Sequence, residues 1–181
     1  NINFENTYWD EMVNFANSKQ QNQVWTKDNL ESGMKSAEYE YTAIYNKNND
    51  LVYYSQVNEN ISSLKNDFSQ IKLDLNKPTF YNYYISHKNK IIKLFIAPIQ
   101  PSHDYKRVTK PQGYMIIGKI LSEKYLEKLE MQTGKHIHLI GKTHTEEFDL
   151  VYPLLSKDKK ILSYLCVHIQ SGTIDKAEEI F

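Results

Sequence analysis

Paired stretches of alternating side chains, each pair joined by a short polar turn, constrain this 181-residue chain most strongly. The sequence period changes to two at Tyr39, and residues 39–45 and 51–55 flank a polar turn at 46–50. Because successive side chains of a strand point to opposite faces, this pattern predicts a β-hairpin. Two more hairpins are predicted in the same way, from residues 80–86 with 90–99 and residues 148–155 with 160–169. Such connections make the sheet antiparallel.

The N-terminal segment has helical periodicity instead. Apolar residues three or four positions apart form one face of a helix over about the first seventeen residues: Phe4, Tyr8, Met12 and Phe15. Further apolar residues widen that face to about half of the circumference, which favours packing on two neighbours. A second helix is predicted over residues 26–37, with Thr26 as its N-cap.

Two helices are predicted between the hairpins, over residues 59–72 and 122–132. The latter follows a strand at 113–120, begins with a capping-box pattern at Ser122 and stops at Gly134. Another strand is predicted at 136–140. Helices at one end of an antiparallel sheet define an α+β domain. We expect one domain over 1–181 without a second core, composed of helices (1–37), an α+β core (38–170) and an exit segment (171–181).

Composition excludes several classes of function. Lys plus Arg and Asp plus Glu number 22 each, so no net charge favours nucleic acid or an anionic membrane. The sequence has no run of 18 apolar residues, so no transmembrane helix is predicted within it. Cys166 is alone, so it forms no intrachain disulfide, and an inert buried thiol is expected. Because no nucleophile, phosphate-binding or zinc-protease motif occurs, no catalytic residue and no cofactor are predicted. The abrupt helical start indicates a piece of a longer protein.

Several short elements occur in an ordered series. They are Tyr8-Trp9-Asp10, Trp25 with Asn29-Leu30, the hairpin at 43–53, Pro98-Ile99 and the strand at 113–121. In this order and spacing the chain resembles the type-four CHASE domain, an extracytoplasmic sensory module. Two positions depart from the family pattern: Asn48-Asn49-Asp50 replaces a turn glycine, and Lys119 stands where arginine is frequent. Asn tolerates the left-handed conformation and Lys keeps the charge.

The resemblance implies a PAS/Cache-like antiparallel sheet with a long N-terminal helix, flanked by two membrane spans. It implies the extracytoplasmic input domain of a membrane signalling protein, such as a sensor histidine kinase, a diguanylate cyclase or a chemoreceptor. The fragment itself would then be no enzyme and would be tethered to the cell membrane. A small molecule of unknown identity is the expected ligand, and the N-terminal helix is the expected contact of a homodimer.

The predicted ligand site is a sheet face beside the N-terminal helices. Alternation places Tyr81 and Tyr83 on one face of their strand, while Lys93 and Tyr114 on adjacent strands are expected to converge there. Tyrosine offers apolar area and a hydroxyl, which suits a small polar ligand. Trp9 and Asp10 are further candidates, with helix packing and a cap or salt bridge as the alternative.

Two other functions stay open. His136 and His138 share a strand face and are suitable zinc ligands, with a third ligand not fixed by spacing among His144, Asp149 and His168. A zinc-dependent enzyme would use this pair. Ordinary exposed or hydrogen-bonded histidines are the simpler interpretation, and no metal site is assigned. The remaining alternative is a structural dimerisation module without a ligand.

Overall fold

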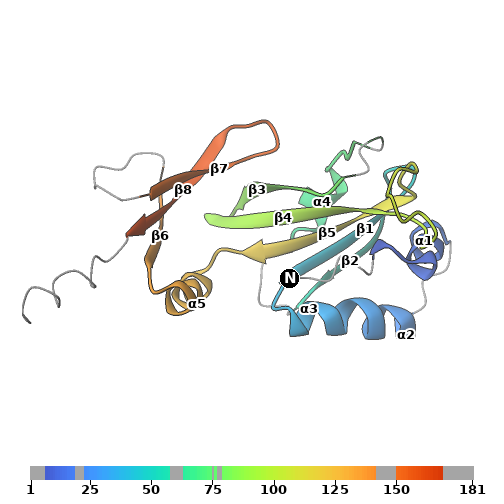
Figure 1. Ribbon diagram of the computed structural model, residues 1–181, viewed down its shortest axis with the longest axis horizontal. Helices are drawn as coiled ribbons and strands as arrows, with labels where there is room; N and C mark the ends of the chain where they lie inside the picture. The colour runs from blue at the N-terminus through green and yellow to red at the C-terminus, as the bar shows by residue number, and fades with distance from the viewer. Residues whose placement is uncertain are drawn as a thin grey trace, which may run out of the picture. The chain divides into compact units, whose positions relative to one another are not determined.

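The computed structural model describes residues 7–18, 23–57, 63–74, 76, 79–141 and 150–168 (Figure 1). It has a mixed α/β fold with a five-stranded antiparallel sheet, a separate three-stranded sheet and short helices. Contacts divide the chain into two compact units where the sequence predicted one core. Unit 1 comprises residues 1–82 and 92–120, and unit 2 comprises residues 83–91 and 121–181.

The five-stranded sheet contains both of the first two predicted hairpins. Its strands are β1 (Tyr41–Asn46), β2 (Leu51–Gln56), β3 (Tyr81–His87), β4 (Lys90–Ile99) and β5 (Gly113–Ile120), in the order β2-β1-β5-β4-β3. The two-residue turn of the second hairpin has Lys88 and Asn89 at φ 46° and 61°. Positive φ at both central positions is the type I′ geometry, whose twist matches that of the flanking strands.

The long N-terminal helix predicted from the sequence is wrong for the described residues. Helix α1 is only eight residues long, Asp10–Asn17. The chain just before it is extended, because Tyr8 forms a parallel bridge with Gln100 and the Gln100 N–H donates to the Thr7 carbonyl at 3.0 Å. At residues 7–9, pairing with the sheet end therefore takes the place of the predicted helix. Residues 1–6 lie outside the described part.

The second predicted helix is present and begins three residues earlier than expected. It consists of α2 (Gln23–Thr26), the π-helical turn η2 (Lys27–Glu31) and α3 (Ser32–Ser36). Thr26 is no N-cap, since its hydroxyl donates to the Gln23 carbonyl at 2.9 Å from inside the helical run. Of the helix predicted over 59–72, the described residues form only α4, Lys65–Ser69.

Each face of the larger sheet is covered within unit 1. Helices α1 to α3 cover one face with buried residues that include Met12, Phe15 and Leu30, which pack on Ile44 and Met115. We call this the helix face. The other face, which we call the α4 face, meets Phe68 of α4. That ring lies 6.4 Å from Tyr41 and 5.6 Å from Tyr54, measured between centroids.

Unit 2 has its own hydrophobic cluster, which the sequence did not predict. It contains α5 (Glu123–Thr133) and the strands β6 (His136–Ile140), β7 (Leu150–Leu155) and β8 (Ile161–His168), in the order β6-β8-β7. Leu126, Ile137 and Val167 are its buried residues. The predicted ends of α5 are confirmed: the Ser122 hydroxyl accepts from the Tyr125 N–H, and Gly134 ends the helix at φ 66°.

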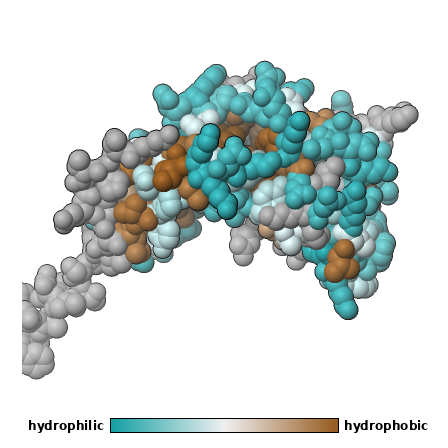
Figure 2. All heavy atoms as spheres, turned by 90° about the horizontal axis from the view of Figure 1, so that it is seen from above, coloured by the Kyte–Doolittle hydropathy of each residue, from teal (hydrophilic) through white to brown (hydrophobic). Residues whose placement is uncertain are grey.

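Unit 2 also presents apolar side chains to solvent. Figure 2 shows hydrophobic residues at the surface of the three-stranded sheet, at the left of the view. Leu150, Val151 and Ile161 are 37–39% exposed there. The exit segment predicted at 171–181, together with His144 and Asp149, lies outside the described residues.

Candidate functional site

Two of the four predicted sheet residues meet at one point in unit 1. The Tyr114 hydroxyl donates to the main-chain carbonyl of Asp74 at 2.6 Å. Burial, and then the nearby Asp74 carboxylate, raises the pKa of Tyr81 to about 12. Tyr83 follows two positions along β3 and is 8% exposed. The structure therefore brings Tyr81 and Tyr114 to Asp74, and it leaves Tyr83 buried in its strand.

Lys93 does not join them. In the β4–β5 register Lys93 is opposite Lys119, whereas Tyr114 is opposite Pro98. Positions 93 and 98 differ by five, so Lys93 and Tyr114 point to opposite faces of the sheet. Lys93 lies on the helix face with Nζ 4.8 Å from the Phe95 ring centroid, and burial lowers its pKa. The predicted convergence of these four side chains is thus wrong, while ligand binding by any of them stays a prediction.

Trp9 packs in the helix-face core. Its ring centroid lies 5.7 Å from that of Trp25, which stacks on Phe15 at 4.6 Å. The Trp25 indole N–H donates to Glu11 at 3.0 Å. This arrangement fixes α2 against α1, which agrees with the packing interpretation of Trp9.

Asp10 connects α1 to the loop between β4 and β5. Its carboxylate accepts from the Ser102 N–H at 3.0 Å and from the Ser102 hydroxyl at 2.5 Å. The hydroxyl and then the amide bond lower the Asp10 pKa. As the first residue of α1, the carboxylate also faces the positive end of the helix dipole. Asp10 therefore ties the helix to loop residues 101–112.

The same loop is organised around the buried Asp104. This carboxylate accepts from the Thr109 hydroxyl, from the Thr109 N–H at 2.8 Å and from the Val108 N–H at 3.1 Å. The Thr109 hydroxyl is the largest cause that lowers the Asp104 pKa. These bonds fold the loop so that Arg107, at φ 50°, turns back over the sheet end.

Arg107 is sandwiched between two aromatic rings. Its guanidinium carbon lies 4.6 Å from the Tyr8 ring centroid and 4.7 Å from that of Phe80. Cation–π contacts of this kind hold the planar guanidinium in a fixed orientation. Tyr8 in turn pairs with Gln100 through the bridge described above. Arg107, Tyr8 and Gln100 therefore form one connected group, which we call the arginine cluster.

Each member of the arginine cluster has a buried polar atom without a hydrogen-bond partner in the described part of the chain. These atoms are the Tyr8 hydroxyl oxygen, Gln100 Oε1 and Arg107 Nη1. A buried polar group left unpaired costs about 1–3 kcal/mol, so each of these three atoms is open to a partner from outside the chain, such as water or a ligand. They offer a hydroxyl, an amide acceptor and a cationic donor. Such a set suits a small ligand with an anionic group.

The sequence analysis did not identify Arg107. One signal was available, because Arg107 is the only arginine in a chain with 22 Lys and Arg residues. Arginine differs from lysine in its planar fork of donors, so the single arginine of a lysine-rich chain is a candidate for planar, bidentate recognition. Its proximity to Tyr8, almost a hundred residues earlier, depends on the fold.

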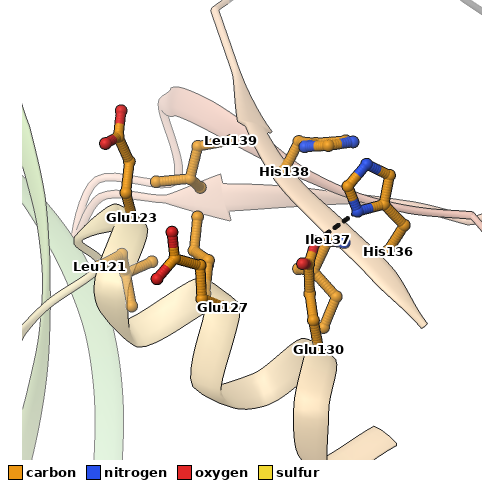
Figure 3. Close-up of a pocket in the computed structure, with 9 residues that line it drawn as sticks. Leu121, Glu123, Glu127, Glu130, His136, Ile137, His138 and Leu139 are labelled. Carbon is orange, nitrogen blue, oxygen red and sulfur yellow. Dashed lines mark hydrogen bonds and ion pairs between the residues drawn. The ribbon is translucent and has the colours of Figure 1, made fainter. Parts of the chain in front are cut away.

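A second group of chemically active side chains lies in unit 2, in a partly open pocket of about 500 Å³ between α5 and β6. Glu130 Oε1 lies 2.6 Å from His136 Nδ1 and accepts from the Ile137 N–H, also at 2.6 Å. The His136 and His138 rings are 4.0 Å apart between centroids. Figure 3 shows both rings beside the Glu130 carboxylate. The predicted His136–His138 pair thus acquires a carboxylate that the sequence did not assign.

Comparison with protein families is decisive for the class of this chain. The family model described as the CHASE4 domain matches residues 2–140, well over half of the sequence. The chain belongs to the CHASE4 domain family. No curated protein matches it. CHASE4 is a sensory domain of signalling proteins, and CHASE domains are extracellular parts of membrane receptors. Among the described residues no helix is both long and apolar enough to span a membrane.

The match covers all of unit 1 except residue 1, and in unit 2 it extends through α5 and β6. Both the arginine cluster and the Glu130–His136–His138 group therefore lie inside the CHASE4 region. Strands β7 and β8 lie beyond it.

Proposed function

We propose that this CHASE4 domain is the extracytoplasmic ligand-sensing input domain of a membrane-bound signal-transduction protein, with a sensor histidine kinase as its output. The observation that carries the proposal is the match to a sensory family over residues 2–140. We infer a binding function and not a catalytic one for the same reason. A PAS/Cache-like relationship is supported by the five-stranded antiparallel sheet.

The arginine cluster is the proposed ligand site. It replaces the site expected around Lys93, because Lys93 and Tyr114 lie on opposite sheet faces. Arg107 would bind a carboxylate or another planar anion through two parallel N–H donors. Tyr8 and Gln100 would orient the remainder of the ligand with their hydroxyl and amide oxygen.

The link between Asp10 and Ser102 provides a route from this site to α1. A ligand that draws Arg107 inward displaces the loop, and the loop is bonded to the first residue of α1. Two states of the domain that differ in the position of α1 are sufficient to switch an output, provided that the ligand binds one state more tightly than the other. In the intact receptor, α1 would meet its counterpart in a homodimer, with the membrane anchors supplying effective concentration.

A thermal-shift screen of the purified chain against carboxylates, amino acids and polyamines tests the ligand site. We expect stabilisation by an anionic compound, its loss in Arg107→Met, and its retention in Lys106→Met. Lys106 is the matched control because it is an exposed cation next in sequence. Anionic hits that stabilise Arg107→Met as strongly as the native chain would place the ligand elsewhere.

Labelling of the full-length receptor in intact cells tests the location. Val24 is 68% exposed, whereas Cys166 is fully buried. We expect Val24→Cys to react with a membrane-impermeant maleimide in intact cells more strongly than the unchanged receptor does. Labelling of Val24→Cys only after cell lysis would contradict an extracytoplasmic position.

A further inference from the structure

The end of α5 and the start of β6 bring three metal-ligating side chains together. Glu130 is in the last turn of α5, Gly134 reverses the chain, and His136 and His138 project from one face of β6. One possible ligand atom from each residue lies within 4.8 Å of the others. Figure 3 shows the carboxylate and both imidazoles gathered at one end of the pocket.

The main chain already orients the carboxylate. Both hydrogen bonds of Glu130 use Oε1, from the Ile137 N–H and with His136 Nδ1. Among the described residues, Oε2 therefore has no bond and is available to an ion. Hydrogen bonds from outside the ligand set generally orient the metal-binding side chains of a site. The Ile137 N–H holds the Glu130 carboxylate in this way, so the carboxylate needs little reordering when a metal binds.

The surroundings attract a cation. Glu123, Glu127 and Glu130 are four and three residues apart on α5, so they lie on one side of the helix. All three line the pocket. Figure 3 shows them along the helix beside β6. Their combined negative field raises the local concentration of divalent ions near the two histidines.

We propose that Glu130, His136 and His138 form a binding site for a divalent transition-metal ion, with zinc as the best match. Two imidazoles and one carboxylate are a zinc ligand set that leaves a fourth position open to water. The proposal concerns metal binding only. It does not depend on the sensor function, because it is tested on the isolated chain without any signalling output.

Small side-chain rotations are sufficient to form the site. Zinc bonds to nitrogen and oxygen at about 2.0–2.2 Å, so tetrahedral ligand atoms lie roughly 3.3–3.5 Å apart. A separation at the 4.8 Å limit therefore has to shorten by about 1.3–1.5 Å. The His136 side chain is 52% exposed and that of Glu130 26% exposed, so both have room to move. Bound metal would displace any proton shared between Glu130 and His136 Nδ1.

Zinc titration of the chelator-treated, dialysed chain, followed by calorimetry and by thermal shift, tests the proposal. We expect one Zn²⁺ per chain, a raised melting temperature and no comparable response to Mg²⁺ or Ca²⁺, because imidazole favours transition metals over hard cations. Co²⁺ in place of Zn²⁺ should give visible absorption bands typical of nitrogen coordination.

Matched histidine variants locate the ion. His136→Gln and His138→Gln should each weaken zinc binding by more than the roughly 10–100-fold that loss of an outer-shell partner causes. His87 is a histidine on β3 outside this group, and the His87→Gln variant should bind zinc as tightly as the native chain does. Glu130→Gln should lower affinity while leaving the melting temperature of the metal-free chain nearly unchanged.

Three results would overturn the site. They are no stoichiometric zinc binding, native affinity in the His136→Gln/His138→Gln double variant, and an equal loss in His87→Gln. If metal binding fails while an anionic ligand still depends on Arg107, the sensor proposal stands and the metal site alone is wrong. If zinc binds as expected while no anionic ligand depends on Arg107, the metal site stands and the proposed ligand site is wrong.

Discussion

Replacement of Gly113 by alanine is the most direct test of how α1 sits on the sheet. Gly113 begins β5 and pairs with Asn46 on β1 and with Ile99 on β4. An added Cβ would lie 2.3 Å from the Tyr45 carbonyl oxygen and 3.3 Å from the Ala16 Cβ of α1. The first distance is about 0.7 Å below the 3.0 Å that real Cβ contacts respect. The missing side chain therefore allows β1 and α1 to approach β5 closely.

The expected penalty follows from these contacts. The obstructing atom at 2.3 Å belongs to the backbone of a central strand, so no flexible side chain can turn aside. Overpacking of this kind costs about 1–3 kcal/mol, and a weakened β1–β5 hydrogen bond adds about 1 kcal/mol. We expect Gly113→Ala to lower the free energy of unfolding by about 2–4 kcal/mol, a large part of typical domain stability.

Gly33→Ala is the matched control. Gly33 is an exposed position in α3, and an added Cβ there meets nothing within 4 Å. Alanine is favoured over glycine in a helix by about 0.8–1.0 kcal/mol, so the same substitution should stabilise the chain. Urea unfolding followed by tryptophan fluorescence measures both, because Trp9 and Trp25 are the chain's two tryptophans and lie in unit 1. A Gly113→Ala variant within about 0.5 kcal/mol of the native chain would refute the reasoning.

Three further substitutions test separate parts of the structure. Phe68→Ala empties a fully buried position between Tyr41 and Tyr54 and should destabilise unit 1 by about 3–5 kcal/mol in urea unfolding. Asp104 has a lowered pKa in the folded chain, so its contribution is present above the unfolded pKa of about 3.9 and is lost as the pH falls through the folded value. Asp104→Asn should accordingly show a weaker dependence of the urea midpoint on pH below about 4 than the native chain; an unchanged acid dependence would contradict this role. Ser122→Ala removes the α5 cap and should cost about 1 kcal/mol, measured as faster amide exchange in α5, with no change in the exchange of β1 as the internal control.

Local patterns in the sequence were sufficient for most of the individual elements. The hairpins of β1–β2, β3–β4 and β7–β8 follow from strands that alternate on either side of short polar turns, and these strands pair with their neighbours in the chain. Helix α5 begins at Ser122 and ends at Gly134 because capping and left-handed glycine are properties of a few adjacent residues. The family resemblance used the same short elements in order, and the CHASE4 match confirms it.

Contacts between distant segments decided the rest. Helical periodicity around Tyr8 predicted a long helix, but pairing of Tyr8 with Gln100 holds that part extended. The strands that carry Lys93 and Tyr114 were both predicted, yet the two side chains lie on opposite faces of the sheet. The register in which β4 pairs with β5 decides this, and the two strands are joined by a long loop that leaves the register open. Arg107 meets Tyr8 only in the folded chain, and Glu130 meets His136 only after α5 turns back on β6. The sequence by itself determined most of the strands and helices, since those choices depend largely on neighbours a few residues away. Tertiary structure alone decided which side chains meet, because a shift of one residue between two strands moves every side chain to the other face.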